Sequence, residues 1–262
     1  MKVKNVLDTL KSVFILAMKD LKVRRKYKFV WINMALTPFF MIAPYVFSAK
    51  ITTQQDIVNN ILIGTLLWYW LNQYFFGVGD GFSEERMEGT LVTIVLSPIS
   101  TVAFLFSKAI DTFIMNLYIT LFTLLFFWLL GIDIYLSFYF FLLLLVSGLY
   151  ITFFSIFFAG LNLLYKRIGT LNYSIQYGIG LLSGMVNPVS NFPFYIRIAS
   201  YLLPLTYLIE AGRVILNSND VTKFFFNLLT VSIMSVVYLV VGVAMLKKAE
   251  HLIRQKGEWE EW

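Results

Sequence analysis

The chain has 262 residues, of which 59% are apolar and 14% are charged, and its formal net charge at pH 7 is +6. Soluble domains average about 45–50% apolar and about 25% charged residues, so this composition excludes an ordinary soluble protein and indicates an integral membrane protein. The sequence has no cysteine, which excludes disulfides, thiolate catalysis and cysteine-ligated metals.

Residues 1–27 are predicted to form an amphipathic helix. At about 100° per residue, apolar residues gather on one side of this helix and basic residues on the other. The apolar side contains Val6, Leu7, Leu10, Val13, Phe14, Ala17, Met18 and Leu21. Such a helix lies along a membrane surface with its basic side toward water or lipid phosphates, so membrane lipids are expected partners.

Long uncharged runs predict the membrane spans. The runs are Phe29–Ala49, Ile57–Gly79, Thr112–Ile132, Ile134–Tyr165, Ile168–Ile196, Ile198–Ile209 and Phe224–Leu246. A helical crossing needs about 20 residues, and continuous apolar character favours helices over barrel strands. The run that contains Pro204 is too short, so it is predicted as a re-entrant hairpin. We therefore expect one all-α domain over residues 1–262 with six transmembrane helices.

The distribution of Lys and Arg predicts the orientation. With six spans and cytoplasmic termini, only four basic residues lie on the outer side, namely Lys50, Arg197, Arg213 and Lys223. Basic residues near span ends prefer the cytoplasmic side. The sequence thus predicts a multi-pass plasma-membrane protein whose loop 83–98, between spans two and three, faces the cytoplasm.

This loop is the one charged island in the middle of the chain. It is predicted to form a single amphipathic helix with Ser83 as N-cap and acidic residues in the first turns, where carboxylates complement the positive helix end. Its candidate contact residues for a soluble partner are Glu84, Glu85, Arg86, Glu88, Gly89, Thr90 and Leu91. Asp80 and Lys108 bracket the loop and are expected to set its depth.

Residues 188–222 are predicted to form an outer re-entrant region. Pro188, Pro193 and Pro204 interrupt helices there, and a broken-helix cap of this kind could act as a gate. Glu210 and Arg213 are three residues apart and share a helix face. They are expected either to form a functional pair or only to mark the interface.

Several other residues in the spans have two possible interpretations each. Tyr69, Gln73 and Phe76 approach one face of the second span and could contact an amphipathic or glycosidic cargo, or they could be ordinary interfacial packing. Asp111 and Asp133 are interpreted as interfacial residues rather than as buried proton carriers.

No catalytic residue or metal site is predicted. The only histidine is His251, in the C-terminal tail, and no glycine-rich phosphate loop is followed by Lys-Ser or Lys-Thr. The chain is therefore not expected to be an enzyme, and ATP hydrolysis would require another subunit.

Two separated motifs resemble one family. Residues 85–91, Glu-Arg-Met-Glu-Gly-Thr-Leu, are followed by Ser-Pro at 97–98, and Asn-Pro-Val-Ser at 187–190 precedes Leu-Pro-Leu-Thr-Tyr at 203–207. This pattern, and the order of the predicted elements over the whole length, is similar to that of the membrane subunits of type 2 ATP-binding cassette exporters.

The resemblance implies a function for each part. Loop 83–98 would be the coupling helix that docks on a separate ATPase subunit, which binds ATP and Mg, so this chain itself needs no cofactor. A second copy or a paralogue would complete the pathway, and nucleic acid is not an expected partner. The implied cargo is a drug, lipid or peptide, with a polysaccharide or teichoic-acid-like lipid-linked glycan as the alternative. A non-transporting scaffold and an intramembrane enzyme are the remaining alternatives.

Overall fold

The computed structural model describes residues 6–51, 55–97, 99–132, 136–165 and 171–256. All regular secondary structure in these ranges is helical, as predicted. The elements are α1 (Val6–Arg25), α2 (Lys28–Lys50), α3 (Gln55–Tyr74), η1 (Phe75–Gly79), α4 (Gly81–Met87), α5 (Leu91–Leu96), α6 (Thr101–Leu129), α7 (Phe138–Leu164), α8 (Asn172–Leu182), η3 (Val189–Asn191), α9 (Phe194–Tyr201), α10 (Pro204–Asn217) and α11 (Val221–Lys256).

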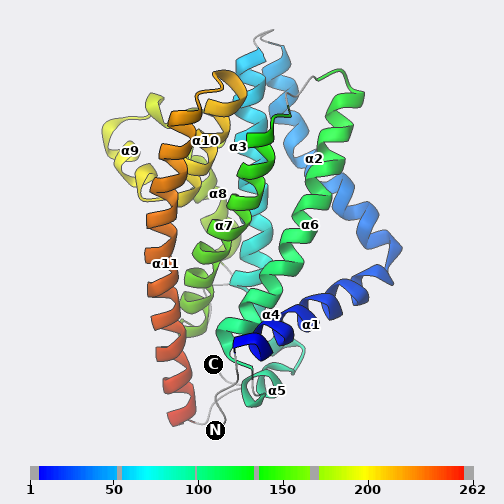
Figure 1. The fold of residues 1–262 in the computed structure, drawn as a ribbon, viewed down its shortest axis with the longest axis vertical. Helices are drawn as coiled ribbons and strands as arrows, with labels where there is room; N and C mark the ends of the chain where they lie inside the picture. The colour runs from blue at the N-terminus through cyan, green and yellow to red at the C-terminus, as the bar shows by residue number, and fades with distance from the viewer. Residues whose placement is uncertain (1–5, 52–54, 98, 133–135, 166–170, 257–262) are drawn as a thin grey trace.

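The bundle has two different ends (Figure 1). Helices α1, α4 and α5 lie at its lower end, which we call the α4 end, whereas α9 and α10 lie toward the upper end, which we call the α9 end. Helix α11 runs along the bundle from the α9 end, and its C-terminal part reaches the α4 end (Figure 1). The described part of the chain thus begins and ends at the α4 end.

Helix α3 lies in the core of the bundle. Most of its side chains are buried, including Trp68, Trp70 and Tyr74. The helix continues into η1, a π-helical turn that leads directly to α4. Short π-helical segments interrupt a helix at places where its geometry must change. Here the change redirects the chain from the bundle core to the short helices of the α4 end.

Four described helices are long and apolar enough to cross a membrane. They are α2, α6, α7 and α11, and the pair α9–α10, bent by 95°, would be a fifth crossing if counted as one span. The multi-pass arrangement is therefore supported, while the exact six-span layout stays a prediction. Helix α3 is not among the four, and its sequence includes the polar residues Asn59, Asn60, Asn72 and Gln73.

The predicted fifth span, Ile168–Ile196, is wrong as a single helix. Its helix α8 has 11 residues, which corresponds to about 16 Å, whereas the hydrocarbon core is about 30 Å thick. The helix ends because Gly184 adopts a positive φ of 79°, and Pro188 and Pro193 follow. The chain then forms η3 and α9 instead of continuing as a crossing. Residues 166–170 lie outside the described ranges.

The third span begins earlier than predicted. Helix α6 starts at Thr101 rather than Thr112, because the Ser100 hydroxyl accepts a hydrogen bond from the Ala103 amide at 3.2 Å and caps the helix. This extension places Lys108 and Asp111 on a regular helix at the α4 end, where they meet α1 and α4.

Candidate functional site

The charged loop forms two short helices, so the predicted single helix over 83–98 is wrong. Helix α4 ends at Met87 and α5 begins at Leu91. Between them Gly89 has a φ of 71°, a left-handed conformation that glycine adopts without the penalty of a Cβ atom. Ser83 is not the N-cap, because α4 already begins at Gly81, after Asp80. Pro98 lies outside the described residues.

Lys108 joins three helices at the α4 end. Its Nζ atom lies 3.2 Å from Glu85 Oε1 and 3.9 Å from Glu84 Oε2, both on α4. The same atom lies 3.5 Å from Asp20 Oδ2 on α1. It is also 5.6 Å from the centre of the Phe104 ring, within the range of a cation–π contact. Lys108 therefore holds α1 and α4 against α6.

A second ion pair fixes α1 on α6. Arg24 Nη2 lies 3.0 Å from Asp111 Oδ2, and Asp111 is only 1% exposed. The interpretation of Asp111 as an interfacial residue is therefore wrong, because α1 covers it. On the apolar side of α1, Val13 and Ala17 are buried, whereas Leu10 and Phe14 stay exposed. Part of the apolar side of α1 thus packs within the protein. Asp133 lies outside the described residues.

A cavity of about 540 Å³ opens between α1, the α4–α5 segment and α6. It is lined by Leu16, Lys19, Asp20, Val23, Arg24, Glu84, Glu85, Glu88, Thr90, Thr93, Ile94, Ser97, Ile99, Phe104, Ser107 and Lys108. The walls combine ion-paired side chains with apolar ones. Ion pairs thus support the α4–α5 segment at its edges, and the cavity leaves space between this segment and its neighbours.

The predicted contact residues divide into a supported base and an exposed turn. Glu85 belongs to the base, since its carboxylate pairs with Lys108 and accepts a hydrogen bond from the Thr90 hydroxyl. Met87 is 84% exposed, and residues 88–90 are exposed as well. Leu91 is buried. We call residues 87–90 the apex. Its side chains project from a segment that ion pairs hold in place.

Two further predicted residues behave differently at this end. Arg86 is half-buried, and burial lowers the pKa of its guanidinium. Glu84 is exposed even though it lies near Lys108. Within the described residues, no three His, Cys, Asp or Glu side chains are grouped so that they could hold a metal ion.

Asp80 connects α4 to two other helices. Its Oδ1 atom accepts a hydrogen bond from Asn162 Nδ2 on α7 at 2.7 Å, and its Oδ2 atom accepts one from Asn172 Nδ2 on α8. Burial raises the pKa of Asp80 to about 6, against the lowering effect of the Asn172 hydrogen bond and with a smaller raising effect from the charge of Glu84. This network was not predictable from the sequence beyond the position of Asp80 beside the loop.

At the α9 end, Arg213 is the central polar residue. It is 5% exposed and donates hydrogen bonds through Nη2 to the carbonyl oxygens of Gly184 and Asn60. Glu210 lies on the same helix face, with its Oε2 atom 3.8 Å from Arg213 Nη1, but the Glu210 side chain is 48% exposed. The two residues do pair, and the backbone contacts of Arg213 are the more buried ones.

The three candidate prolines stand at helix boundaries. Pro188 directly precedes η3, Pro193 directly precedes α9, and Pro204 is the first residue of α10. A proline at a helix start is favourable because its missing N–H would have no partner there. The prolines therefore define the bends of the α9 end.

The candidate pathway residues lie along α3 and η1. Tyr69 is buried and its hydroxyl accepts a hydrogen bond from Gln73 Nε2 at 2.7 Å. Phe76 is partly exposed. The structure brings Tyr69 and Gln73 together, as their spacing predicted, but Tyr69 itself is covered by protein.

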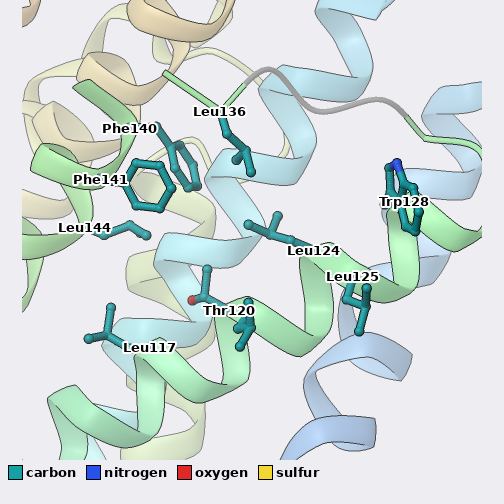
Figure 2. Close-up of a pocket in the computed structure, with 10 residues that line it drawn as sticks. Leu117, Thr120, Leu124, Leu125, Trp128, Leu136, Phe140, Phe141 and Leu144 are labelled. Atoms are coloured by element: carbon teal, nitrogen blue, oxygen red, sulfur yellow. The ribbon is translucent and has the colours of Figure 1, made fainter. Parts of the chain in front are cut away.

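An apolar groove of about 410 Å³ lies between α6 and α7 (Figure 2). It is lined by Leu117, Thr120, Leu121, Leu124, Leu125, Trp128, Leu136, Phe140, Phe141 and Leu144. The Thr120 hydroxyl accepts a hydrogen bond from Trp70 Nε1 at 2.8 Å. This bond satisfies the Thr120 hydroxyl, which is the main polar group of the groove, so the groove offers apolar contacts. These residues were not predicted from the sequence.

Comparison with known proteins gives one result. The family model described as ABC-2 type transporter matches residues 11–217, which is most of the chain. The matched region contains both the Lys108 cluster and Arg213. A search of curated proteins found no match.

Proposed function

Because the chain belongs to the ABC-2 type transporter family and is a transmembrane permease of such a transporter, we propose that α4 and α5 transmit to its membrane helices the movement that drives export. In this proposal the apex docks on a separate ATPase subunit, which binds ATP and Mg. Two copies of the chain, or the chain and a paralogue, line the pathway. The α4 end faces the cytoplasm.

The observation that carries the proposal is the exposed apex on an ion-paired base. An apex that receives force from another subunit must be accessible to it. Met87 and residues 88–90 are exposed and meet this requirement. Its base must also be connected to the membrane helices. Lys108 supplies that connection to α6 and α1. Closure of the ATPase subunits would then shift these helices as rigid bodies.

We further propose a hydrophobic or amphipathic cargo, such as a drug, lipid or peptide. The apolar groove between α6 and α7 supports this choice because its walls suit an apolar tail (Figure 2). A lipid-linked glycan is the alternative; the partly exposed amide of Gln73 favours it, whereas Tyr69 is covered by protein. Transport assays with both cargo classes in vesicles would separate them.

Copurification tests whether α4 and the apex dock on the ATPase subunit. The chain is coexpressed with its ATPase subunit, and the triple charge reversal E84K/E85K/E88K is compared with D56K, which reverses an exposed acid at the start of α3. We expect the triple variant to lose copurification and cargo-stimulated ATPase activity, whereas D56K keeps both. If stimulation survives the triple reversal, α4 and α5 are not the docking element.

A single variant at the turn makes the test more specific. G89A adds a Cβ atom that meets no other atom within 4 Å, so its effect comes from the strained φ alone, at a cost of about 1–2 kcal/mol. We expect G89A to disturb the apex and weaken ATPase stimulation while membrane insertion stays normal. Normal stimulation in G89A would show that the shape of the turn is not recognised.

A further inference from the structure

Helix α8 contacts α3 at three levels, although it is too short to cross a membrane alone. At the α4 end, Asp80, which follows α3 and η1, accepts a hydrogen bond from Asn172 at the start of α8. Asn172 is fully buried. Since Asp80 also immediately precedes α4, one carboxylate joins the start of α4 to the start of α8.

The middle level is a close helix contact. Trp68 Nε1 donates a hydrogen bond to the carbonyl oxygen of Gln176 at 3.1 Å. A Cβ atom at Gly180 would lie only 2.4 Å from Trp68 Cδ1. The absence of a side chain at Gly180 thus allows the indole of α3 to lie against the backbone of α8. At the neighbouring Gly178 a Cβ atom would meet nothing within 4 Å.

The third level lies toward the α9 end. A Cβ atom at Gly64 of α3 would lie 2.0 Å from the carbonyl oxygen of Met185, just after α8. Arg213 of α10 donates to the carbonyl of Gly184, after α8, and to that of Asn60, in the first part of α3. One guanidinium therefore joins α10 to both helices.

From these contacts we propose that α3 and α8 form one rigid strut that carries a displacement of α4 to the α9 end, with Asp80 and Arg213 as the positioning residues at its two ends. The inference rests on the proposed function, in which α4 receives the displacement. Hydrogen bonds at both ends and close backbone packing between them prevent α8 from sliding along α3. The bends of α9 and α10 then move when α8 moves.

Because the sequence has no cysteine, a pair of introduced cysteines can carry spin labels at two defined sites of this chain. Labels at Leu96, on the helix that follows the apex, and at Lys248, both exposed, report movement of the apex, and labels at Tyr195 and Ile51, also exposed, report movement of the α9 end. Distances are measured in the complex with the ATPase subunit, first without nucleotide and then with trapped ATP. In the unmodified complex we expect both distances to change.

Two matched pairs of variants then test the strut. G180A forces α8 away from Trp68, whereas G178A in the same helix fills open space. N172A removes the Asp80 contact to α8, whereas N162A removes the hydrogen bonds from α7 to Asp80 and to the Gly79 carbonyl. We expect G180A and N172A to keep the ATP-dependent change at the apex and to lose at least half of the change at the α9 end. G178A and N162A should keep both changes.

The outcomes separate this inference from the proposed function. A full change at the α9 end in both G180A and N172A would overturn the strut while leaving the role of α4 intact. An unmodified complex whose apex does not move with ATP would overturn the role of α4 and the strut with it. Copurification with the ATPase subunit shows that each variant has folded at the α4 end, and N172A covers the case in which G180A does not fold.

Discussion

The two ends of the bundle hold their buried charges in opposite ways. At the α4 end the buried group is the carboxylate of Asp111, and its partner is the side chain of Arg24. At the α9 end the buried group is the guanidinium of Arg213, and its closest partners are backbone carbonyls. Lys108 extends the first pattern, since it lies within 4 Å of three carboxylates.

This difference affects how each end can move. Ion pairs between side chains can exchange partners when their side chains rotate, so the α4 end can change shape and keep its charges paired. A guanidinium bound to backbone carbonyls keeps its partners only if the chain segments stay in place. The α4 end is therefore suited to adapt to a docking subunit, and the α9 end to move as a body or not at all.

The largest effect is expected from removing the buried cation of the α9 end. R213A removes the hydrogen bonds from the guanidinium to the carbonyls of Gly184 and Asn60. Hydrogen bonds to charged groups contribute about 1.5–3 kcal/mol each, so we expect the free energy of unfolding to fall by about 3 kcal/mol. Denaturant titration of the purified chain in detergent measures this change.

Arg197 offers the matched control. It also donates to two backbone carbonyls, those of Ser190 and Phe192, but it is partly exposed. Water can replace its hydrogen bonds, so R197A should cost well under half as much as R213A. Equal losses for the two variants would contradict the special role given to the buried guanidinium.

A smaller loss is expected at the α4 end. R24A leaves Asp111 buried without its cation, but Arg24 is 37% exposed and Asp111 can take up a proton, so we expect a loss of about 2 kcal/mol. The same truncation of the exposed pair Lys223–Asp220, whose lysine side chain is 73% exposed, should cost less than about 0.5 kcal/mol.

A double-variant cycle tests the cause of that loss. D111N removes the charge that needs Arg24, so R24A should cost little in a D111N background. If R24A is equally costly with and without Asp111, the loss comes from packing of the Arg24 side chain rather than from the ion pair.

Long apolar runs in the sequence predicted the helical class and located α2 and α7 closely, because such runs leave the chain no alternative in a membrane. It failed at α8, where hydrophobicity continues although Gly184 turns the backbone. Hydropathy measures the environment of the side chains and not the direction of the chain, so a run of 29 uncharged residues over 168–196 was mistaken for one helix.

The candidate site was predicted in part for a similar reason. The charged residues of α4 and the apex were identifiable because charges in an apolar chain must reach water. That Lys108 links Glu84 and Glu85 to Asp20 was not predicted, since α1 and α6 are distant in the sequence and only the fold brings them together. Asp111 was misjudged because the covering helix α1 was expected on the membrane surface rather than against α6.

Titration of Asp80 provides a pH-dependent test of the α4 end. Its pKa is raised from 3.8 to about 6, so the folded state favours the protonated carboxyl. The stability that protonation contributes is full below pH 3.8 and is lost as the pH rises to about 6. Allowing for its partial exposure, we expect a loss of about 1 kcal/mol across this window.

The charge of Glu84 contributes to the raised pKa of Asp80. D80N should abolish the loss between pH 4 and pH 6.5, measured as the free energy of unfolding, whereas E84Q should only shift it to lower pH. An unchanged pH profile in D80N would assign the titration to another carboxylate.

The smallest effect is expected from Glu210, and it decides whether the α9 end depends on a side-chain pair at all. Glu210 is half-exposed and lies 3.8 Å from Arg213, so water screens the interaction. E210Q should change the free energy of unfolding by less than about 0.5 kcal/mol. A loss comparable to that of R213A would mean that Glu210, and not the backbone carbonyls, holds the guanidinium, and the contrast between the two ends would then disappear. Measured beside R213A in the same titration, E210Q therefore tests directly whether the α9 end is fixed by its backbone.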